Sequence, residues 1–145
     1  MTRVLGLDMG QRRIGLALSD SLGLTAGPLG VLPNTGTQGT IKAIEAIVNK
    51  HQVNAIVVGL PLTLKGSRGS QAQKVESFTR ELGKTVSLPI FLVDERLTTV
   101  QGERALREIR APRKRRDEVI DQVAAQLILQ SYLDSQNPND ASNYA

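Results

Sequence analysis

The second half of the chain alternates strand-like and helix-like segments, and this alternation constrains the fold more than any other feature. Residues 55–59 are apolar on both faces and rich in β-branched side chains, which is typical of a buried parallel strand. Apolar residues recur at helical spacing before this run, over residues 41–51, and after it, over residues 71–82. A second buried strand is expected over residues 89–93. Parallel strands joined through helices require right-handed crossovers, so this half predicts an α/β fold.

The first third of the chain contains three strand-like runs instead. Residues 3–8 and 14–18 are short apolar runs separated by a turn. Residues 26–32 form a weaker run that two glycines and a proline interrupt, so we expect this strand at an edge of the sheet, followed by a loop over residues 34–39. Three strands joined by short connections favour an antiparallel meander. One five-stranded mixed sheet with helices on both faces satisfies both parts of the sequence.

The last third is expected to hold two helices and a tail. A capping-box spacing predicts a helix over residues 98–109. A basic loop over residues 110–116 then leads into a last helix over residues 117–133. We expect one domain over residues 1–136 and a polar, disordered tail over residues 137–145.

The composition narrows the chemistry that a site in this chain can use. The chain has no cysteine, and His51 is its only histidine. This excludes disulfides, thiolate zinc sites, cysteine nucleophiles and clusters of histidine ligands, so metal or acid–base chemistry has to rely on carboxylates. The net charge of +4 favours a polyanionic partner, and the aromatic content of 3% disfavours a base-stacking platform.

The sequence gives no indication of a membrane partner. No apolar run approaches the roughly 20 residues that a membrane span needs. The apolar stretch before Asp8 is too short for a signal peptide. We therefore expect a cytoplasmic protein, and the sequence leaves open whether it is a monomer or a homodimer.

Carboxylates follow the strands that are expected to be parallel. Asp8 ends the first strand, and Asp94 and Glu95 directly follow the strand at residues 89–93. If these two strands run parallel, all three groups reach the same end of the sheet, where open α/β sheets bind ligands. The alternative for each residue alone is an ordinary turn former.

Asp121 is a carboxylate in an otherwise apolar helical stripe. It falls on the same helical face as Ile128, and the sequence pattern places Gln122, Gln126 and Gln130 on the opposite, exposed face. A carboxylate in a packed face is costly unless it is paired or coordinated. Two interpretations therefore remain open: a buried salt bridge to an arginine, or a metal ligand that acts with the strand-end carboxylates on Mg²⁺ or Mn²⁺.

Basic residues gather close to the same end of the sheet. Lys65 and Arg68 lie in the loop after residues 55–59, and Arg96 follows Glu95. A further run precedes the last helix and consists of Arg110, Arg113, Lys114, Arg115 and Arg116. Each group can be a solvated surface, but for the run we favour contact with nucleic-acid phosphates. Arg96 can either pair with a carboxylate or hold the scissile phosphate.

Five short motifs occur in the order and at the spacing of a known protein family. They are LGLDMG at residues 5–10, RIGLA at 13–17, VGLP at 58–61, DERLT at 94–98 and IDQVAA at 120–125. In these motifs the chain resembles the bacterial RuvX/YqgF family over about residues 1–134. The resemblance implies a ribonuclease H-like fold, with the strands of the sheet in the order 3-2-1-4-5.

The same resemblance implies a metal-dependent nuclease in which Asp8, Glu95 and Asp121 are the catalytic and metal-binding residues. Asp94 adjoins Glu95 and can share its role. The strand at residues 55–59 ends in Gly59, where related nucleases often place a carboxylate, so Glu95 has to reach in from the next strand, about 10 Å away. The expected substrate is the 5′ end of pre-16S rRNA. The alternatives are a Holliday junction and, in another functional class, a non-catalytic RNA-binding assembly factor.

Overall fold

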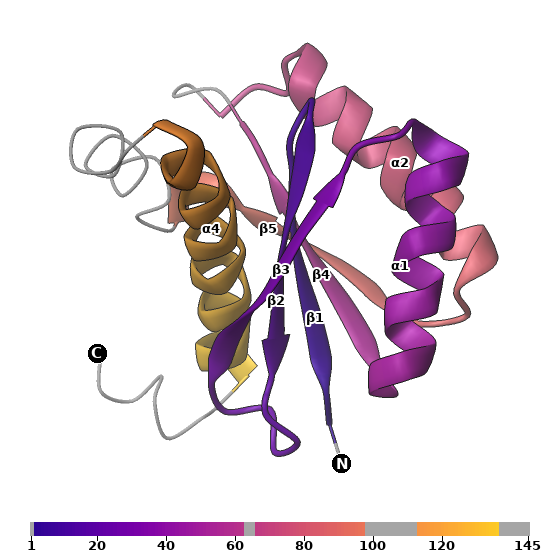
Figure 1. Cartoon of the computed structure of the whole chain (residues 1–145), viewed down its shortest axis with the longest axis vertical. Helices are drawn as coiled ribbons and strands as arrows, with labels where there is room; N and C mark the ends of the chain where they lie inside the picture. Colours follow the sequence, from indigo (N-terminus) through magenta and orange to yellow (C-terminus); the bar gives the residue numbers. More distant parts are fainter. Residues whose placement is uncertain (1, 63–65, 98–112, 137–145) are drawn as a thin grey trace.

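Five strands form one mixed sheet (Figure 1). The computed structural model of the chain describes residues 2–62, 66–97 and 113–136, the side chains of residues 97 and 113–118 excepted. The strand order is β3-β2-β1-β4-β5, which confirms the expected order. In chain order the strands are β1 (Val4–Met9), β2 (Arg13–Ser19), β3 (Ala26–Pro33), β4 (Ala55–Leu60) and β5 (Ile90–Asp94).

The strands pair antiparallel in the first part of the chain and parallel in the second, as the sequence predicted. β1 pairs antiparallel with β2, and β2 pairs antiparallel with β3, so the first three strands form the predicted meander with β3 at an edge. β4 pairs in parallel with both β1 and β5. β1, β4 and β5 therefore finish at the same end of the sheet, which we call the carboxyl end.

Helices cover both faces of the sheet, as predicted. α1 (Thr37–His51) and α2 (Ser70–Thr85) lie on one face, and α4 (Arg113–Gln136) crosses the other (Figure 1). Leu5 and Leu7 of β1 belong to the apolar cluster on the α1 and α2 side, whereas Val4 belongs to the cluster under α4. Because side chains alternate along a strand, each strand residue can be assigned to one of the two faces.

Glycines in the sheet let α4 lie close to it. A Cβ added at Gly6 of β1 would lie 2.8 Å from the Cβ of Leu129, and one added at Gly59 of β4 would collide with the side chain of Ile128. Two buried alanines of α4, Ala124 and Ala125, belong to the same interface. The backbone of α4 therefore comes directly against the strands.

The polar side of α4 packs against β3 instead of facing solvent. The prediction that Gln122, Gln126 and Gln130 are exposed is wrong, because all three are half-buried. Oε1 of Gln130 accepts a hydrogen bond of 2.9 Å from the backbone N–H of Ala26, and Nε2 of Gln126 donates one of 3.4 Å to the carbonyl of the same residue. Glutamine side chains thus satisfy backbone groups of an edge strand that has no neighbouring strand on that side.

Two helices begin earlier than predicted. α4 begins at Arg113, so residues 113–116 form its first turn instead of a loop. Lysine and arginine are good helix formers, and nothing between Arg113 and residue 117 interrupts a helix. α1 begins at Thr37, inside the segment 34–39 that the sequence predicts as a loop.

Two predictions fall on residues that the structure does not describe. They are the helix expected over residues 98–109 and the tail expected over residues 137–145. Among the residues that are described, no helix combines the length and the apolar character needed to cross a membrane.

β5 is an edge strand, and the prediction of a buried strand over residues 89–93 is wrong in this respect. Phe91 and Leu92 are each 41% exposed. Phe91 stacks on Tyr132 of α4 with ring centroids 5.2 Å apart, so this tyrosine packs against the edge strand. A run that is apolar on both faces indicates a parallel strand, but it does not show whether a further strand lies beyond it.

Candidate active site

Asp8 lies in β1 between two glycines of the neighbouring strands. Leu7 packs on the α1 and α2 side, so the next side chain, that of Asp8, lies on the face covered by α4, where it is only 3% exposed. In β2 its partner is Gly15. In β4 the register pairs Val58 with Leu7, which places Gly59 beside Asp8 on the other side.

The glycine on the β2 side makes room for Asp121. A Cβ added at Gly15 would collide with the backbone oxygen of Asp121 and lie 3.1 Å from its Cβ. Asp121 therefore stands directly over β2, one strand from Asp8. Neighbouring strands are about 4.8 Å apart, so these two carboxylates belong to one site.

The glycine on the β4 side makes room for Glu95. Glu95 is the first residue of the short 3₁₀ helix η1 (Glu95–Leu97) that follows β5, and it is 5% exposed. Its Oε1 lies 2.8 Å from the position that a Cβ at Gly59 would take. The side chain thus reaches back over β4 toward Asp8. It spans the two-strand separation that the sequence predicted between Glu95 and Asp8.

Asp8, Glu95 and Asp121 therefore form a row on one face of the sheet, over β1, β4 and β2 respectively. All three lie at the carboxyl end. The structure brings together these three predicted residues and supplies the reason for glycine at both flanking positions, since a larger residue at either one would displace a carboxylate or α4.

Arg13 of β2 holds Asp121 in this structure. Its Nε lies 2.8 Å from Oδ2 of Asp121, with side-chain exposures of 35% and 15%. The salt bridge that the sequence left open is thus present, and it does not exclude a role for Asp121 in metal binding. Arg13 was not predicted as a site residue from the sequence, although its position two residues before Gly15 puts it on the same face of the strand.

Asp94 and Arg96 pair with each other. Nη2 of Arg96 donates to Oδ2 of Asp94 at 2.7 Å, and the backbone N–H of Arg96 donates to Oδ1 at 2.9 Å. The side-chain hydrogen bond from Arg96 holds the pKa of the Asp94 carboxyl below its usual value. Asp94 is aligned with Leu60, one residue beyond the Gly59 position over which Glu95 lies. Its oxygens are therefore engaged beside the row instead of within it.

The remaining predicted basic residues are only partly described. Arg68 is exposed and pairs with Glu76 of α2 at 2.9 Å. Lys65 and Arg110 lie outside the described residues. Arg113, Lys114, Arg115 and Arg116 occupy the first turn of α4, the helix that carries Asp121.

The row offers only carboxylate oxygens, and this donor set fits Mg²⁺ or Mn²⁺ better than a soft metal. Over residues 2–62, 66–97 and 113–136, no three acidic or histidine side chains are already gathered closely enough to hold a metal ion. The bond from Arg13 occupies one oxygen of Asp121. A cation held by all three residues would therefore require the side chains to move closer together, with Asp121 offering its second oxygen, Oδ1, or giving up Arg13.

Two solved structures resemble this chain over nearly its whole length. The T. thermophilus RuvC structure in complex with a Holliday junction substrate gives a TM-score of 0.59 at 12% identity, covering 94% of this chain and 96% of that chain. The fowlpox virus Holliday junction resolvase gives 0.55 at 12% identity, covering 92% and 99%. Both similarities concern the fold, and they confirm the expected ribonuclease H-like architecture.

Sequence relatives are much closer. A protein of Roseiflexus sp. (strain RS-1) named "Putative pre-16S rRNA nuclease" is 46% identical over 134 residues, which cover 92% of this chain and 95% of that protein. One of the same name from Moorella thermoacetica is 46% identical over 137 residues, covering 94% and 98%. Residues 2–135 match the family model described as "RuvX: Holliday junction resolvase". The chain therefore belongs to the RuvX family.

Proposed function

We propose that this protein is a divalent-metal-dependent nuclease that hydrolyses phosphodiester bonds at the 5′ end of pre-16S rRNA. The observation that carries the proposal is the row of Asp8, Glu95 and Asp121 at the carboxyl end of the sheet. The names of the relatives at 46% identity support the choice of substrate. A cytoplasmic location stays a prediction.

The three carboxylates would hold Mg²⁺ or Mn²⁺. Such an ion, when bound, supplies a Lewis acid and an activated water at a phosphodiester. Asp8 and Glu95 are almost fully buried, so they are held in place by the packing around them before any substrate arrives. Asp121 would join them while Arg13 orients its carboxylate, and the guanidinium of Arg13 lies on the same face, where it could meet a phosphate. Asp94 keeps Arg96 beside Glu95.

Basic residues around the row would bind the substrate backbone. Arg96 follows Glu95 directly, and Arg68 lies in the loop that leads from β4 into α2. Residues 113–116 start the helix that carries Asp121. Together with Lys65 and Arg110, these side chains would contact phosphates on either side of the cut. Such contacts fix the position of the strand without reading its sequence.

The test is a cleavage assay with purified protein and a labelled pre-16S rRNA fragment, in Mg²⁺, in Mn²⁺ and in EDTA. We expect metal-dependent cleavage by the wild type and none by Asp8→Asn, because an amide of the same size cannot neutralise a dication. Asp8→Asn should still fold and still bind the RNA. Asp134→Asn, a half-buried aspartate near the other end of α4, is the matched control and should cleave normally. Metal-dependent cleavage by Asp8→Asn at close to the wild-type rate would refute the site.

A Holliday junction is the second candidate substrate. The description of the family and the two resolvase structures favour it. A four-way DNA junction offered beside the RNA, at the same protein and metal concentrations, distinguishes the two by the ratio of cleavage rates. If neither is cut while RNA is bound equally well by the wild type and Asp8→Asn, the protein is a non-catalytic RNA-binding factor instead.

A further inference from the structure

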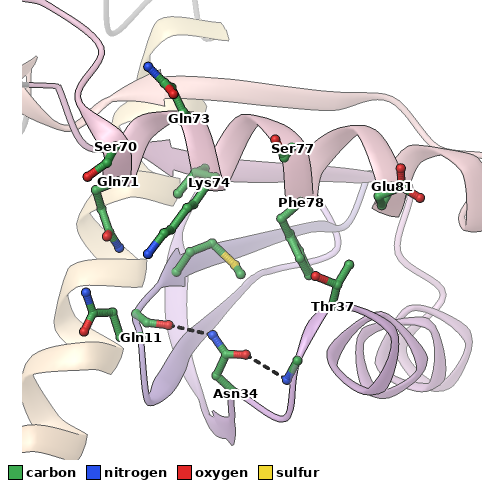
Figure 2. Close-up of a pocket in the computed structure, with 14 residues that line it drawn as sticks. Gln11, Asn34, Thr37, Ser70, Gln71, Gln73, Lys74, Ser77, Phe78 and Glu81 are labelled. Atoms are coloured by element: carbon green, nitrogen blue, oxygen red, sulfur yellow. Dashed lines mark hydrogen bonds between the residues drawn. The ribbon is translucent and has the colours of Figure 1, made fainter.

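A second polar site lies on the opposite face of the sheet from the carboxylates. A cavity of about 830 Å³ opens between α2, the β1–β2 turn and the segment that leads into α1. Figure 2 shows Gln71 and Lys74 extending from α2 toward this turn, where Gln11 lies. The volume falls within the range of about 300–1,000 Å³ that is typical of small-molecule sites, so one nucleotide can enter.

Several polar side chains at this cavity have no partner in the described part of the chain, and three of them matter here. Gln11, Gln71 and Lys74 make no side-chain hydrogen bond or ion pair there. Asn34 is fixed instead: its Nδ2 donates to the carbonyl of Gly10 at 2.9 Å, and its Oδ1 accepts from a backbone N–H at 3.1 Å (Figure 2). The cavity thus has a rigid floor and, opposite it, donors and acceptors that are available to a ligand.

The rest of the lining combines the neutral polar residues Thr37, Ser70, Gln73 and Ser77 with apolar residues and one acidic residue. Met9, Val75 and Phe78 supply an apolar wall, and Phe78 extends toward the start of α1 (Figure 2). Lys74 and Glu81 are the charged members of the lining, one of each sign. A lining with one ammonium, two unpaired amides and an apolar wall suits a ligand that carries both an aromatic ring with polar edges and a single anionic group.

The cavity and the carboxylate row are separated only by the end of β1. Met9 directly follows Asp8, and its side chain lies on the other face of the strand. The β1–β2 turn lies between the two sites at the carboxyl end of the sheet. A nucleic-acid strand that has its scissile phosphate at Asp8 can therefore cross this turn and bring a nearby nucleotide to the cavity.

We propose that this cavity binds one unpaired nucleotide of the substrate strand, close to the cut. Lys74 holds its phosphate, and the amides of Gln11 and Gln71 hydrogen-bond the polar edge of its base, as glutamine does with base edges elsewhere. A bare phosphate would leave the amides and the apolar wall unused. This inference rests on the proposed nuclease function, since it is the substrate that delivers the nucleotide.

The first experiment tests the cavity without any cleavage. The four ribonucleoside 5′-monophosphates, their 2′-deoxy counterparts and inorganic phosphate are titrated separately into the ¹⁵N-labelled protein, and the side-chain amide signals of Gln11, Asn34 and Gln71 are followed by NMR. We expect at least one nucleotide to shift them and phosphate alone to leave them unchanged. Lys74→Gln and Gln71→Ala should each weaken the binding severalfold. Lys50→Gln, an exposed lysine at the far end of α1, makes the same charge change outside the cavity and should have no effect.

The second experiment places the nucleotide in the substrate. A single abasic residue is moved along the RNA around the cut, and binding is measured by fluorescence anisotropy with Asp8→Asn protein, which we expect not to cleave. One position should lose about tenfold in affinity, the size expected for one well-made base contact. When Lys74→Gln and Gln71→Ala are combined with Asp8→Asn, an abasic residue at that position should no longer reduce the affinity.

The outcomes separate this proposal from the proposed function. Equal shifts with phosphate and nucleotides, or an abasic loss that persists in the Lys74 and Gln71 variants, would overturn the nucleotide site even if the RNA is cleaved normally. Nucleotide-dependent shifts in a protein that cuts neither the RNA nor the four-way junction would support the site and overturn the nuclease. A preference for ribonucleotides or deoxyribonucleotides in the titration shows whether the bound strand is RNA or DNA.

Discussion

The ion pair between Arg13 and Asp121 predicts how the metal-free protein responds to loss of one carboxylate. Asp121→Asn keeps the size of the side chain and removes its charge. Two effects oppose each other: relief of repulsion from Asp8 and Glu95, and loss of the 2.8 Å bond to Arg13. With Arg13 in place the charge of Asp121 is already balanced, so we expect the loss of the bond to dominate.

The magnitude follows from the exposure of the two partners. Fully exposed pairs contribute about 0.2–1 kcal/mol, and breaking a fully buried pair costs about 3–5 kcal/mol. At 35% and 15% exposure this pair lies between these limits, and we expect Asp121→Asn to lower the free energy of unfolding by about 1–2 kcal/mol. In a domain of this size that corresponds to a decrease in Tm of about 2–8 °C.

The assay is thermal unfolding followed by circular dichroism in EDTA and again in Mg²⁺. Arg13→Gln should lower Tm in EDTA by a similar amount, and the double variant should show a coupling energy of about 1 kcal/mol. Asp134→Asn is the control on the same helix. Mg²⁺ should raise the Tm of Arg13→Gln more than that of the wild type, because the variant has one positive charge fewer beside the carboxylates. A higher Tm for Asp121→Asn in EDTA would refute the reasoning, since it would mean that carboxylate repulsion outweighs the ion pair.

Three further predictions test other parts of the structure. Gly15→Ala should lower stability by about 2–3 kcal/mol in denaturant unfolding, because the new methyl group meets the backbone of α4, which cannot yield as a side chain can. The lowered pKa of Asp94 contributes stability that is present above the usual value of 3.8 and is lost as the pH falls through the folded-state pKa, so Asp94→Asn should flatten the Tm-against-pH curve in that acid range. Replacing all four basic residues 113–116 with glutamine should reduce the slope of log affinity against log salt by about two to three units, measured in Ca²⁺, and an unchanged slope would assign them to a solvated surface.

The topology was predictable from the sequence because it depends on local patterns. Short connections between apolar runs specify the meander, and helices between the later runs specify parallel pairing. The strand order and the assignment of Asp8, Glu95 and Asp121 came from the resemblance to a family. Helical periodicity could not predict which strand each side of a helix packs against. It placed Gln126 and Gln130 on the correct side of α4, but it could not show that β3 lies under that side.

The site illustrates the same limit at the level of single residues. From the sequence alone, Glu95 was expected to lie two strands away from Asp8. The sequence pattern gives the number of strands between two residues, but it does not show that a glycine leaves space for a side chain above the strand between them. Gly59 removes the obstacle, and the side chain of Glu95 uses the space. Arg13 was missed for a related reason: one arginine among many becomes meaningful only when Gly15 brings α4, and with it Asp121, within reach of the strand. Glycine at these two positions therefore constrains the site as much as the carboxylates do. Substitutions at Gly15 and Gly59 should therefore change mainly the geometry of the site. Amide substitutions of the three carboxylates should change mainly its charge.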